Sequence, residues 1–560
     1  GGDKVEKELF TFIAGGTAGA GIRKAGAVAG YIFTRMGRRV FEMEDYQSLI
    51  KGGHNFAVVS SATYPIKSHY MRADLVVATD KRSYHMHKDH LRDGGIMVFN
   101  SDAMKDETVP NGIGIPFTTI SKKYTNSELR LGVGAVTVLA VSIGMSKDEL
   151  ADVIREQYRD AENNINFAME IYDAAAPQLF GKFALKKTNE KPLPMISGNE
   201  AISLGAVAGG LDFFFAYPMT PASSILHFLA AHAKEFQIGV MHPESELAAI
   251  NMALGAASMG LKTMVASSGG GMALMEEAFS LSGMAEVPVL AVLGSRPGPS
   301  TGVPTYTEQG DLRFAINQGH GEFPRVVASP YSMEEAFYLA AEMLGLVQEF
   351  QTLGILLTEK HLGESRMTVD IDPTKAYWAE PIMYQGGDEK YLRYKITEDG
   401  ISPLLFPPSD QVIKFTSYEH DEYGVSTEDP QMIAKMHEKR AKKQETLVQK
   451  LMQMHTVNVF GHGEPVIFTY GSTTMSVLEA LQCANLEATV VQPIYLEPFP
   501  TWEFEKFKNV NPIVVEQSVM GAFETLIKEK TGIKAKASIR KYDGRPFDPE
   551  ELAQQIKEVI

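Results

Sequence analysis

Three times along the chain, a short apolar segment typical of a buried strand runs into a glycine-rich turn that opens a helix. The three pairs are 9–14 with Gly15–Gly21, 263–267 with Ser268–Gly271, and 465–470 with Gly471–Thr473. Strands that alternate with helices form open, mostly parallel sheets covered by helices on both faces. The pattern predicts a multidomain α/β protein, and the length of 560 residues suggests about three or four domains.

The first glycine turn permits more than one interpretation. A helix expected over 22–36 and a strand expected at 39–41 complete a βαβ unit, and backbone N–H groups at such a helix start can hold a phosphate. Glu42 and Glu44 lie about where a ribose-binding acid would follow. The spacing departs from Gly-x-Gly-x-x-Gly, so a nicotinamide dinucleotide, another phosphate-bearing ligand and a purely structural turn all stay open.

Composition divides the chain into five parts. A polar stretch with two prolines is typical of a domain boundary, and an irregular segment rich in Tyr, Gly, Pro and acids precedes a charged helix. The charged residues 438–445 of that helix are expected to form a solvated face. The expected parts are an α/β domain 1–185, a linker 186–196, an α/β domain 197–370, a connecting segment 371–459 and an α/β domain 460–560.

Charge and cysteine content exclude several classes of protein. Asp and Glu number 69 against 53 Lys and Arg, a net charge of −16 that argues against nucleic acid as the main partner. The single cysteine, Cys483, excludes a disulfide framework and a cysteine-ligated iron–sulfur or zinc site in these residues. It is expected to be buried and inert, and it fits a reducing, cytoplasmic location. The apolar stretch 131–145 falls short of the ~18 residues of a membrane span, and the start lacks a signal-peptide pattern.

Two polar motifs in the first domain carry weak signals. His85, His87 and His90 could hold a metal, but exposed histidines in a helix or loop are the favoured interpretation. The motif 51–55, Lys-Gly-Gly-His-Asn, suits a polar ligand and a surface turn equally well.

Three motifs of the second domain have residue types suited to binding a ligand. The prolines of 217–221 fix the backbone around Thr220 at the end of a strand, where open α/β sheets bind ligands. Arg296 lies in a Pro/Gly turn where it can bind a carboxylate through two hydrogen bonds, with Thr301 as a further donor, or can form a structural ion pair. Glu244 and Glu246 precede a small-residue helix, where such a carboxyl either favours the helix start or shares a proton with a ring nitrogen.

Together these motifs resemble the α subunit of 2-oxoacid:ferredoxin oxidoreductases. The residues that carry the resemblance are 198–205, 217–223, 263–276, 296–302 and 419–424. The first domain, with 48–55, resembles the family's γ subunit. The order γ then α resembles the fused large subunit of two-subunit enzymes, including 2-oxoglutarate:ferredoxin oxidoreductase.

The resemblance implies a fold and a chemistry. It implies an N-terminal Rossmann-like γ domain, a thiamine-diphosphate pyrimidine-binding domain and a C-terminal transketolase-C-like domain. Such enzymes use thiamine diphosphate, coenzyme A and ferredoxin to decarboxylate a 2-oxoacid oxidatively to an acyl-CoA, or run the reverse carboxylation. The first substrate we expect is 2-oxoglutarate.

The resemblance also implies roles for single residues. Glu246 matches the glutamate that binds the pyrimidine N1′, and Tyr217 and Pro218 belong to the turn expected to contact the cofactor. Thr220, Arg296 and Thr301 match positions that receive the carboxylate and keto group of the substrate. Glu246, Thr220 and Arg296 are therefore the expected catalytic residues. The sequence departs from relatives in two places. The turn 217–223 has Met219 and Ala222, a change expected to affect the shape of the substrate pocket, and the first domain has Gly-Gly-Thr-Ala-Gly at 15–19 where relatives have Gly-Gly-Gln-Gly, so the resemblance assigns no coenzyme A contacts there.

Two motifs that are missing from these residues indicate a partner subunit. They contain no Gly-Asp-Gly motif followed by Asn, the usual magnesium–diphosphate motif, and no cysteine set for a cluster. The resemblance places Mg²⁺ and a [4Fe–4S] cluster in a β subunit, so no metal is expected in this chain. The chain is expected to be inactive alone and to act in a heterodimer or an (αβ)₂ assembly.

Other functions remain open at this point. They are a broad-specificity subunit for pyruvate or branched-chain 2-oxoacids, a thiamine enzyme of another type, a nicotinamide-dependent dehydrogenase that uses Gly15–Gly21, and a non-catalytic assembly subunit.

Overall fold

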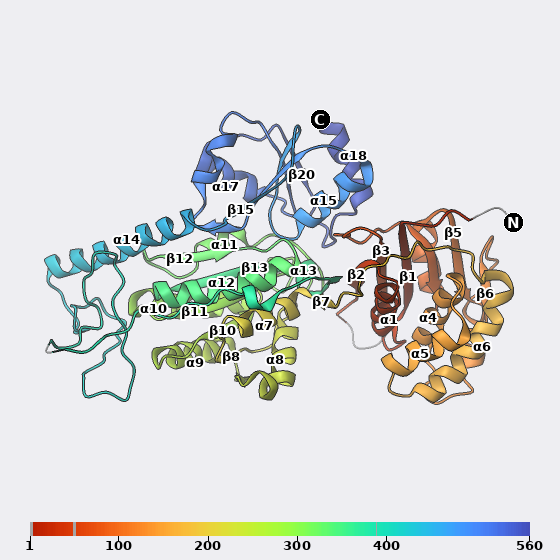
Figure 1. Ribbon diagram of the computed structural model, residues 1–560, viewed down its shortest axis with the longest axis horizontal. Helices are drawn as coiled ribbons and strands as arrows, with labels where there is room; N and C mark the ends of the chain where they lie inside the picture. The colour runs from red at the N-terminus through yellow and green to blue at the C-terminus, as the bar shows by residue number, and fades with distance from the viewer. Residues whose placement is uncertain (1–3, 49–51, 388) are drawn as a thin grey trace. The chain divides into compact units, whose positions relative to one another are not determined.

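The computed structural model describes residues 4–48, 52–387 and 389–560. They divide into two compact units (Figure 1). Unit 1 holds the chain up to Ile196 together with two later segments, Glu364–Asp370 and Asp548–Leu552. Unit 2 holds the rest. Lys51 of the glycine–histidine motif lies outside the described residues.

Unit 1 is built on a mixed eight-stranded sheet with the order β6-β5-β4-β1-β3-β2-β14-β7. The strands are β1 Leu9–Thr17, β2 Arg39–Asp45, β3 His54–Ala62, β4 Ala73–Ala78, β5 Leu91–Asn100, β6 Ile113–Ile115, β7 Met195–Ser197 and β14 Arg366–Thr368. The runs 56–60, 75–78 and 95–100, which look like strands in the sequence, lie in β3, β4 and β5.

The predicted βαβ unit forms with a change that the sequence did not indicate. β3 lies between β1 and β2 and pairs with both in antiparallel fashion, so the strands on either side of helix α1 (Ile22–Arg35) are not neighbours. The sheet is therefore mixed at its centre, whereas β1, β4, β5 and β6 pair in parallel.

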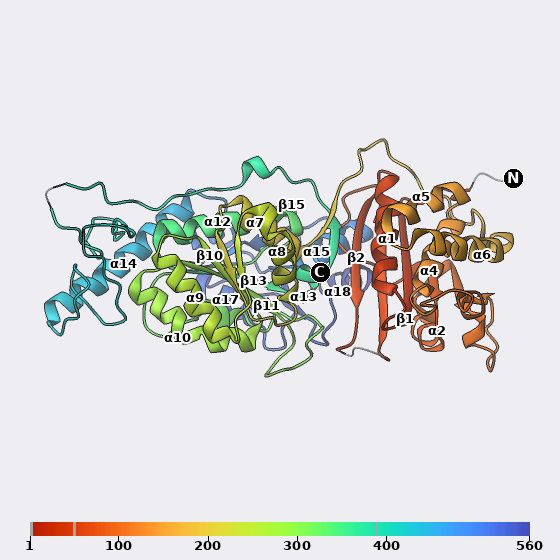
Figure 2. The same cartoon turned by 90° about the horizontal axis from the view of Figure 1, so that it is seen from below.

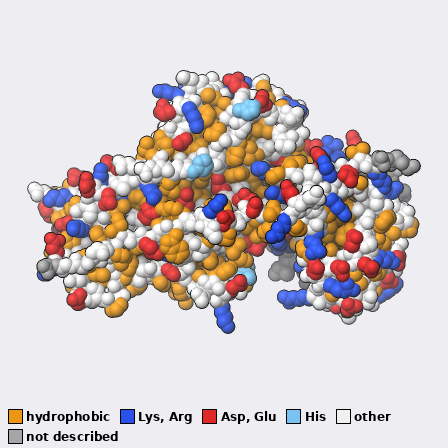
Figure 3. Space-filling model, viewed as in Figure 1, with side chains coloured by type: hydrophobic (Ala, Val, Ile, Leu, Met, Phe, Trp, Pro, Cys, Tyr) orange, Lys and Arg blue, Asp and Glu red, His pale blue; other side chains and the backbone are white. Residues whose placement is uncertain are grey.

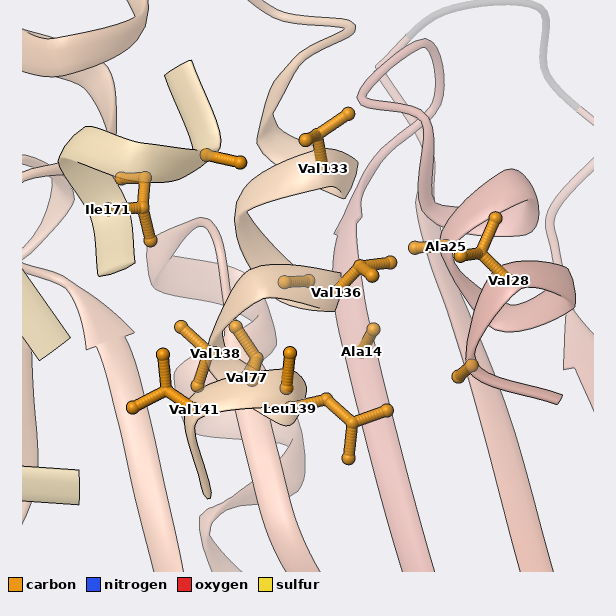
Figure 4. Close-up of a cluster of buried hydrophobic side chains, with 14 of the residues drawn as sticks. Ala14, Ala25, Val28, Val77, Val133, Val136, Val138, Leu139, Val141 and Ile171 are labelled. Atoms are coloured by element: carbon orange, nitrogen blue, oxygen red, sulfur yellow. The ribbon is translucent and has the colours of Figure 1, made fainter. Parts of the chain in front are cut away.

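The longest apolar stretch becomes a helix that is buried on all sides. In α4 (Leu131–Ser142), every residue from Gly132 to Ser142 is buried. Figure 4 shows Val136 and Leu139 of α4 beside Ala14 of β1 and Val77 of β4. Such packing explains the uniform hydrophobicity. Across the described residues, none of the helices combines the length and the hydropathy that a membrane crossing needs.

Residues 147–163 have helical spacing throughout, but they form parts of two helices. A break at 158–160 separates them, and there Tyr158 adopts an extended conformation. The helices are α2 Lys81–His87, α3 Phe117–Ser121, α5 Lys147–Gln157 and α6 Ala161–Leu179.

Unit 2 contains a seven-stranded sheet with the order β18-β12-β13-β11-β10-β8-β9. All recorded pairings are parallel except that of the edge strand β18 with β12. Helices α7 and α12 pack against each other, and α9 and α10 form a second pair (Figure 2). The strands are β8 Phe213–Phe215, β9 Gly239–Met241, β10 Thr263–Ser267, β11 Val289–Ser295, β12 Arg325–Ala328, β13 Leu353–Glu359 and β18 Tyr495–Glu497. The helices are α7 Gly198–Ala208, α8 Ser223–Phe236, α9 Glu246–Ser258, α10 Gly269–Ala285, α11 Leu312–Ile316, α12 Met333–Phe350 and α13 Lys360–Glu364.

A five-stranded sheet completes unit 2, with the order β15-β17-β16-β19-β20. Its strands share one apolar core with the seven-stranded sheet, since Phe468 and Val514 belong to the same buried cluster as Val265. The strands are β15 Val457–Gly461, β16 Val466–Phe468, β17 Thr489–Pro493, β19 Ile513–Glu516 and β20 Ala537–Arg540. The helices are α15 Thr473–Ala484, α16 Thr501–Phe504, α17 Ala522–Thr531 and α18 Pro549–Val559, of which residues 549–552 belong to unit 1.

The expected solvated face at 438–445 is wrong. Helix α14 (Pro430–Met452) buries Lys439 and Lys443 almost completely. Lys439 Nζ lies 2.9 Å from Glu286 Oε2, and Lys443 contacts the same carboxylate. Arg393 donates to the backbone oxygen of Glu286 at 2.7 Å, so three buried cations surround one buried acid.

The expectation for Cys483 is also wrong, because this residue is exposed on α15. Leu481, two residues earlier, is buried, whereas Gln482 and Cys483 are exposed. On the face of the molecule shown in Figure 3, acidic and basic side chains are interspersed.

Candidate active site

The predicted site residues gather where three neighbouring strands of the seven-stranded sheet end. The proline turn 217–221 follows β8, the glycine segment 268–271 follows β10, and the turn that begins at Arg296 follows β11. These strands are adjacent and parallel, so their carboxyl ends meet at one edge. Ligands bind at such an edge in open α/β sheets.

Arg296 joins two of these turns. Its Nη1 atom donates a hydrogen bond of 2.9 Å to the backbone oxygen of Thr220. Partial burial lowers the pKa of Arg296 from its usual value, but an arginine keeps its charge throughout the ordinary pH range. The remaining guanidinium donors can bind a carboxylate.

A cavity of about 590 Å³ opens beside Arg296. Its wall includes Thr301 from the same turn, Met219 from the proline turn, and Ser268 and Gly270 from the segment after β10. A volume of this size suits a small organic ligand. The residues that form the cavity wall do not include Glu246 or Tyr217.

Glu246 is the first residue of α9 and is only 4% exposed. Ser245 caps the helix, since its Oγ accepts a hydrogen bond of 3.2 Å from the backbone N–H of Ala248. A Cβ atom on Gly271 would lie 2.9 Å from Glu246 Cγ and 1.8 Å from Ser267 Oγ, so this close approach requires glycine. The glutamate thus lies behind the glycine segment whose neighbour, Gly270, lines the cavity.

The two glutamates ahead of α9 differ in environment. Glu244 is exposed, whereas Glu246 is buried. The side chain of Glu246 therefore lies inside the domain, next to the glycine segment that borders the cavity.

Two family models match the chain. The model described as "Pyruvate flavodoxin/ferredoxin oxidoreductase, thiamine diP-bdg" matches residues 204–439, and "Pyruvate ferredoxin/flavodoxin oxidoreductase" matches residues 11–175. A 2-oxoacid:ferredoxin oxidoreductase subunit alpha from Sulfolobus sp is 30% identical over 98% of this chain and 97% of that protein. The chain belongs to the 2-oxoacid:ferredoxin oxidoreductase family. The predicted resemblance is therefore confirmed.

Two further relatives of this family are informative. The 2-oxoglutarate synthase subunit KorA from Archaeoglobus fulgidus is 37% identical over 32% of this chain and 52% of that protein. A solved 2-oxoglutarate:ferredoxin oxidoreductase from Magnetococcus marinus, with 2-oxoglutarate, coenzyme A and succinyl-CoA bound, is 29% identical. It has a TM-score of 0.90 and covers 99% of this chain and 100% of that chain. The multidomain α/β fold expected from the sequence is confirmed.

Asp311 belongs to the site but was not predicted from the sequence. It lines the cavity, and Ser295 Oγ donates a hydrogen bond of 2.9 Å to its Oδ2 atom. Burial raises the pKa of Asp311, and the bond from Ser295 opposes that change. The acids Glu308 and Asp311 follow closely after the Arg296 turn in the sequence, which was the one available signal.

Tyr217, expected to contact a cofactor, is half-exposed at the start of the proline turn. Its ring makes an edge contact with His242, with 5.8 Å between the centroids. Pro218 lies next to it and is partly buried. Neither residue is brought against Glu246 by a described contact.

The first glycine turn packs closely against its surroundings. Added Cβ atoms would lie 3.0 Å from Ser83 Oγ at Gly15, 2.4 Å from Thr79 Oγ1 at Gly16 and 2.6 Å from the backbone oxygen of Leu129 at Gly21. These close contacts account for three of the glycines, and no bound ligand is needed to explain them. Glu44, one of the two candidate ribose-binding acids, forms an ion pair of 2.7 Å with Arg23.

Of the three histidines expected to be exposed, His85 is exposed, but His87 is buried and His90 is partly buried, and these two form a row with His54. His87 is fully buried, and its Nε2 lies 3.0 Å from His54 Nε2 while its Nδ1 lies 3.1 Å from His90 Nδ1. Ser83 Oγ lies 3.4 Å from His54 Nδ1 and donates to Asp80. In each N···N pair one ring donates and the other accepts, so only one of the two facing nitrogens carries a proton. Burial disfavours a positive charge on these rings. No group of three or more metal-binding side chains occurs in the described part of the chain.

We expect this row to make unit 1 less stable as the pH is lowered. Burial, reinforced by its two histidine neighbours, lowers the pKa of His87 to about 2, and burial lowers those of His54 and His90. The unfolded histidines gain protons below about pH 6.5, whereas the folded ones gain them only at a lower pH. Stability is therefore present above that pH and is lost below it, by up to about 1.4 kcal/mol per pH unit for each histidine.

The measurement is urea unfolding by circular dichroism from about pH 7.5 to about pH 5.5. His87→Leu should show a shallower loss than the wild type, because one titrating ring is removed. His85→Leu is the control, since His85 is exposed on the same helix. Equal slopes in all three proteins would contradict the prediction.

Proposed function

We propose that this chain is the fused γα subunit of a thiamine-diphosphate-dependent 2-oxoacid:ferredoxin oxidoreductase. The enzyme would convert a 2-oxoacid and coenzyme A to an acyl-CoA and CO₂ with transfer of two electrons to ferredoxin, or run the reverse reaction. The observation that carries the proposal is the buried Glu246 behind the glycine wall of a cavity that also contains Arg296. Parts 1–185, 197–370 and 460–560 would be the γ-type, pyrimidine-binding and transketolase-C-like domains.

The residues present fit the aminopyrimidine ring of the cofactor. Glu246 would hold a proton between its carboxylate and the ring N1′, and Tyr217 and Pro218 would lie along the ring. Gly271 keeps the space next to Glu246 free of a side chain. When bound, thiamine diphosphate supplies the electron sink for the pair released with CO₂.

Arg296, Thr220 and Thr301 would bind the reacting end of the substrate. The guanidinium of Arg296 is already oriented by its bond to the Thr220 backbone and can hold a carboxylate in a fixed position until CO₂ leaves. Thr301 lines the same cavity and adds a hydroxyl donor.

The first substrate we propose is 2-oxoglutarate. Support comes from the solved relative that contains 2-oxoglutarate and from the relative named 2-oxoglutarate synthase. The alternative is a broad-specificity enzyme for pyruvate and branched-chain 2-oxoacids, which suits the relatives named only for 2-oxoacids.

The chain would need a partner. The relatives are named as subunits, and the 560 residues contain one cysteine. We propose a cytoplasmic (αβ)₂ assembly in which the β subunit carries Mg²⁺, the diphosphate site and a [4Fe–4S] cluster that passes electrons to ferredoxin.

The test is purification of this chain with its native partners. The eluate should be brown from iron–sulfur absorbance and should reduce viologen in a coenzyme A-dependent reaction with 2-oxoglutarate, pyruvate or 2-oxoisovalerate. A colourless, inactive chain that binds NADH tightly would instead favour a dehydrogenase. An active complex whose turnover survives Glu246→Ala and Arg296→Ala would favour a non-catalytic assembly subunit.

A further inference from the structure

Helix α10 begins at the cavity with unpaired backbone donors. Its first intrahelical bond runs from the N–H of Met272 to the oxygen of Ser268, at 3.0 Å. The N–H groups of Gly269, Gly270 and Gly271 precede that bond, and Ser268 makes no side-chain cap. The start of a 17-residue helix attracts an anion, because its N–H groups and its dipole act together.

The serine at this helix start is an independent indication of a ligand. Ser268 is 1% exposed, lines the cavity, and its Oγ atom has no hydrogen-bond partner in the described residues. A buried hydroxyl without a partner is rare in native structures. A ligand oxygen held by the helix start would give this hydroxyl an acceptor.

The cavity wall carries one basic and one acidic side chain. Arg296 contributes a cation. Asp311 is the acid of the wall, and burial disfavours its ionised form. A Cβ atom added to Gly269 would lie about 3.5 Å from the carboxyl oxygens of Asp311. The hydrogen bond to this carboxyl group comes from Ser295, not from the start of α10.

We propose that the start of α10, formed by Ser268, Gly269 and Gly270, binds the second carboxylate of a 2-oxo dicarboxylic acid. The inference rests on the proposed function, which assigns the reacting carboxylate to Arg296 and Thr301. Two separate sets of donors on one cavity then fit the two ends of a diacid. The start of α10 thereby discriminates diacids from monoacids of similar length.

The test places a fixed carboxylate in this subsite. Gly270→Asp is sterically permitted, because a Cβ atom there would lie 3.7 Å from Met219 Cε, an ordinary contact. Its side chain would occupy the helix start with its own negative charge. Gly270→Asn is the matched control, since it has the same size without the charge.

The complex is assayed with 2-oxoglutarate and 2-oxobutyrate. We expect the ratio of kcat/KM for the diacid to that for the monoacid to fall about 10- to 100-fold in Gly270→Asp, and less than about threefold in Gly270→Asn. A fall in both substrates alike, or an equal fall in both variants, would overturn the subsite.

Binding measurements separate this inference from the proposed function. Glutarate should bind the wild-type complex more tightly than butyrate, and Gly270→Asp should remove that difference while the affinity for thiamine diphosphate stays the same. A wild type that does not prefer glutarate, or a variant that loses only cofactor affinity, would refute the inference. A complex that oxidises no 2-oxoacid would refute the proposed function, whatever glutarate does.

Discussion

Glu246→Gln is expected to lower the kcat of the assembled enzyme about 10²- to 10⁴-fold. Glutamine has nearly the same size, so the start of α9 and its contact with Gly271 are retained. The amide cannot hold a proton as a carboxyl does, and the ring nitrogen of the cofactor would lose its acid–base partner. The measurement is coenzyme A-dependent viologen reduction, with the affinity for thiamine diphosphate as a separate readout.

Glu244→Gln is the matched control for this experiment. Glu244 precedes the same helix by two residues but is exposed, so its replacement should leave turnover close to that of the wild type. If Glu246→Gln kept kcat within about threefold of the wild type, Glu246 would have no role in catalysis.

Glu286→Gln is expected to destabilise unit 2 by about 3–5 kcal/mol. Burial opposes the ionised form of Glu286, but Lys439, Lys443 and Arg393 outweigh it and hold the pKa of this carboxyl well below its usual range. Burial lowers the pKa of Lys443 to about 8 even with Glu286 beside it. Removal of the one negative charge leaves three buried cations without an anion.

Tryptophan fluorescence in urea can measure this loss. Both tryptophans of the chain, Trp378 and Trp502, lie in unit 2, so the signal reports that unit. Glu445→Gln is the control. Glu445 pairs with Lys442 on the exposed side of α14, the helix that carries Lys439 and Lys443, so its replacement should change stability by less than about 0.5 kcal/mol. Equal midpoints for the two variants would show that the buried cluster does not stabilise the unit.

Local pattern predicted the elements that build the site. Strand β10 spans the predicted residues 263–267, and the small-residue helix expected next to Glu246 is α9, which begins at that residue. Both follow from features a few residues apart: an apolar run that ends in glycine, and a glutamate beside a run of small residues. The same reasoning placed the proline turn and Arg296 at strand ends, and parallel pairing then brought them to one edge.

Features that depend on distant partners could not be predicted. The charged stretch of α14 looked solvated because Glu286, its buried partner, lies 153 residues from Lys439 in the sequence. His87 looked exposed because His54, 33 residues earlier, covers it from a strand. Asp311 joins the cavity only through the fold of the long turn after β11.

Unit 1 is completed by strand β14, which comes from residues 366–368 and pairs with β2 through Arg366 and Met367. Val40 of β2 also donates to Thr368 Oγ1, at 3.1 Å. A chain cut at the linker 186–196 would therefore lack β14. It would leave β2 as an open sheet edge, able to pair with other chains. Residues far beyond the linker thus complete the first sheet, and a separately produced unit 1 would need another covering for that edge.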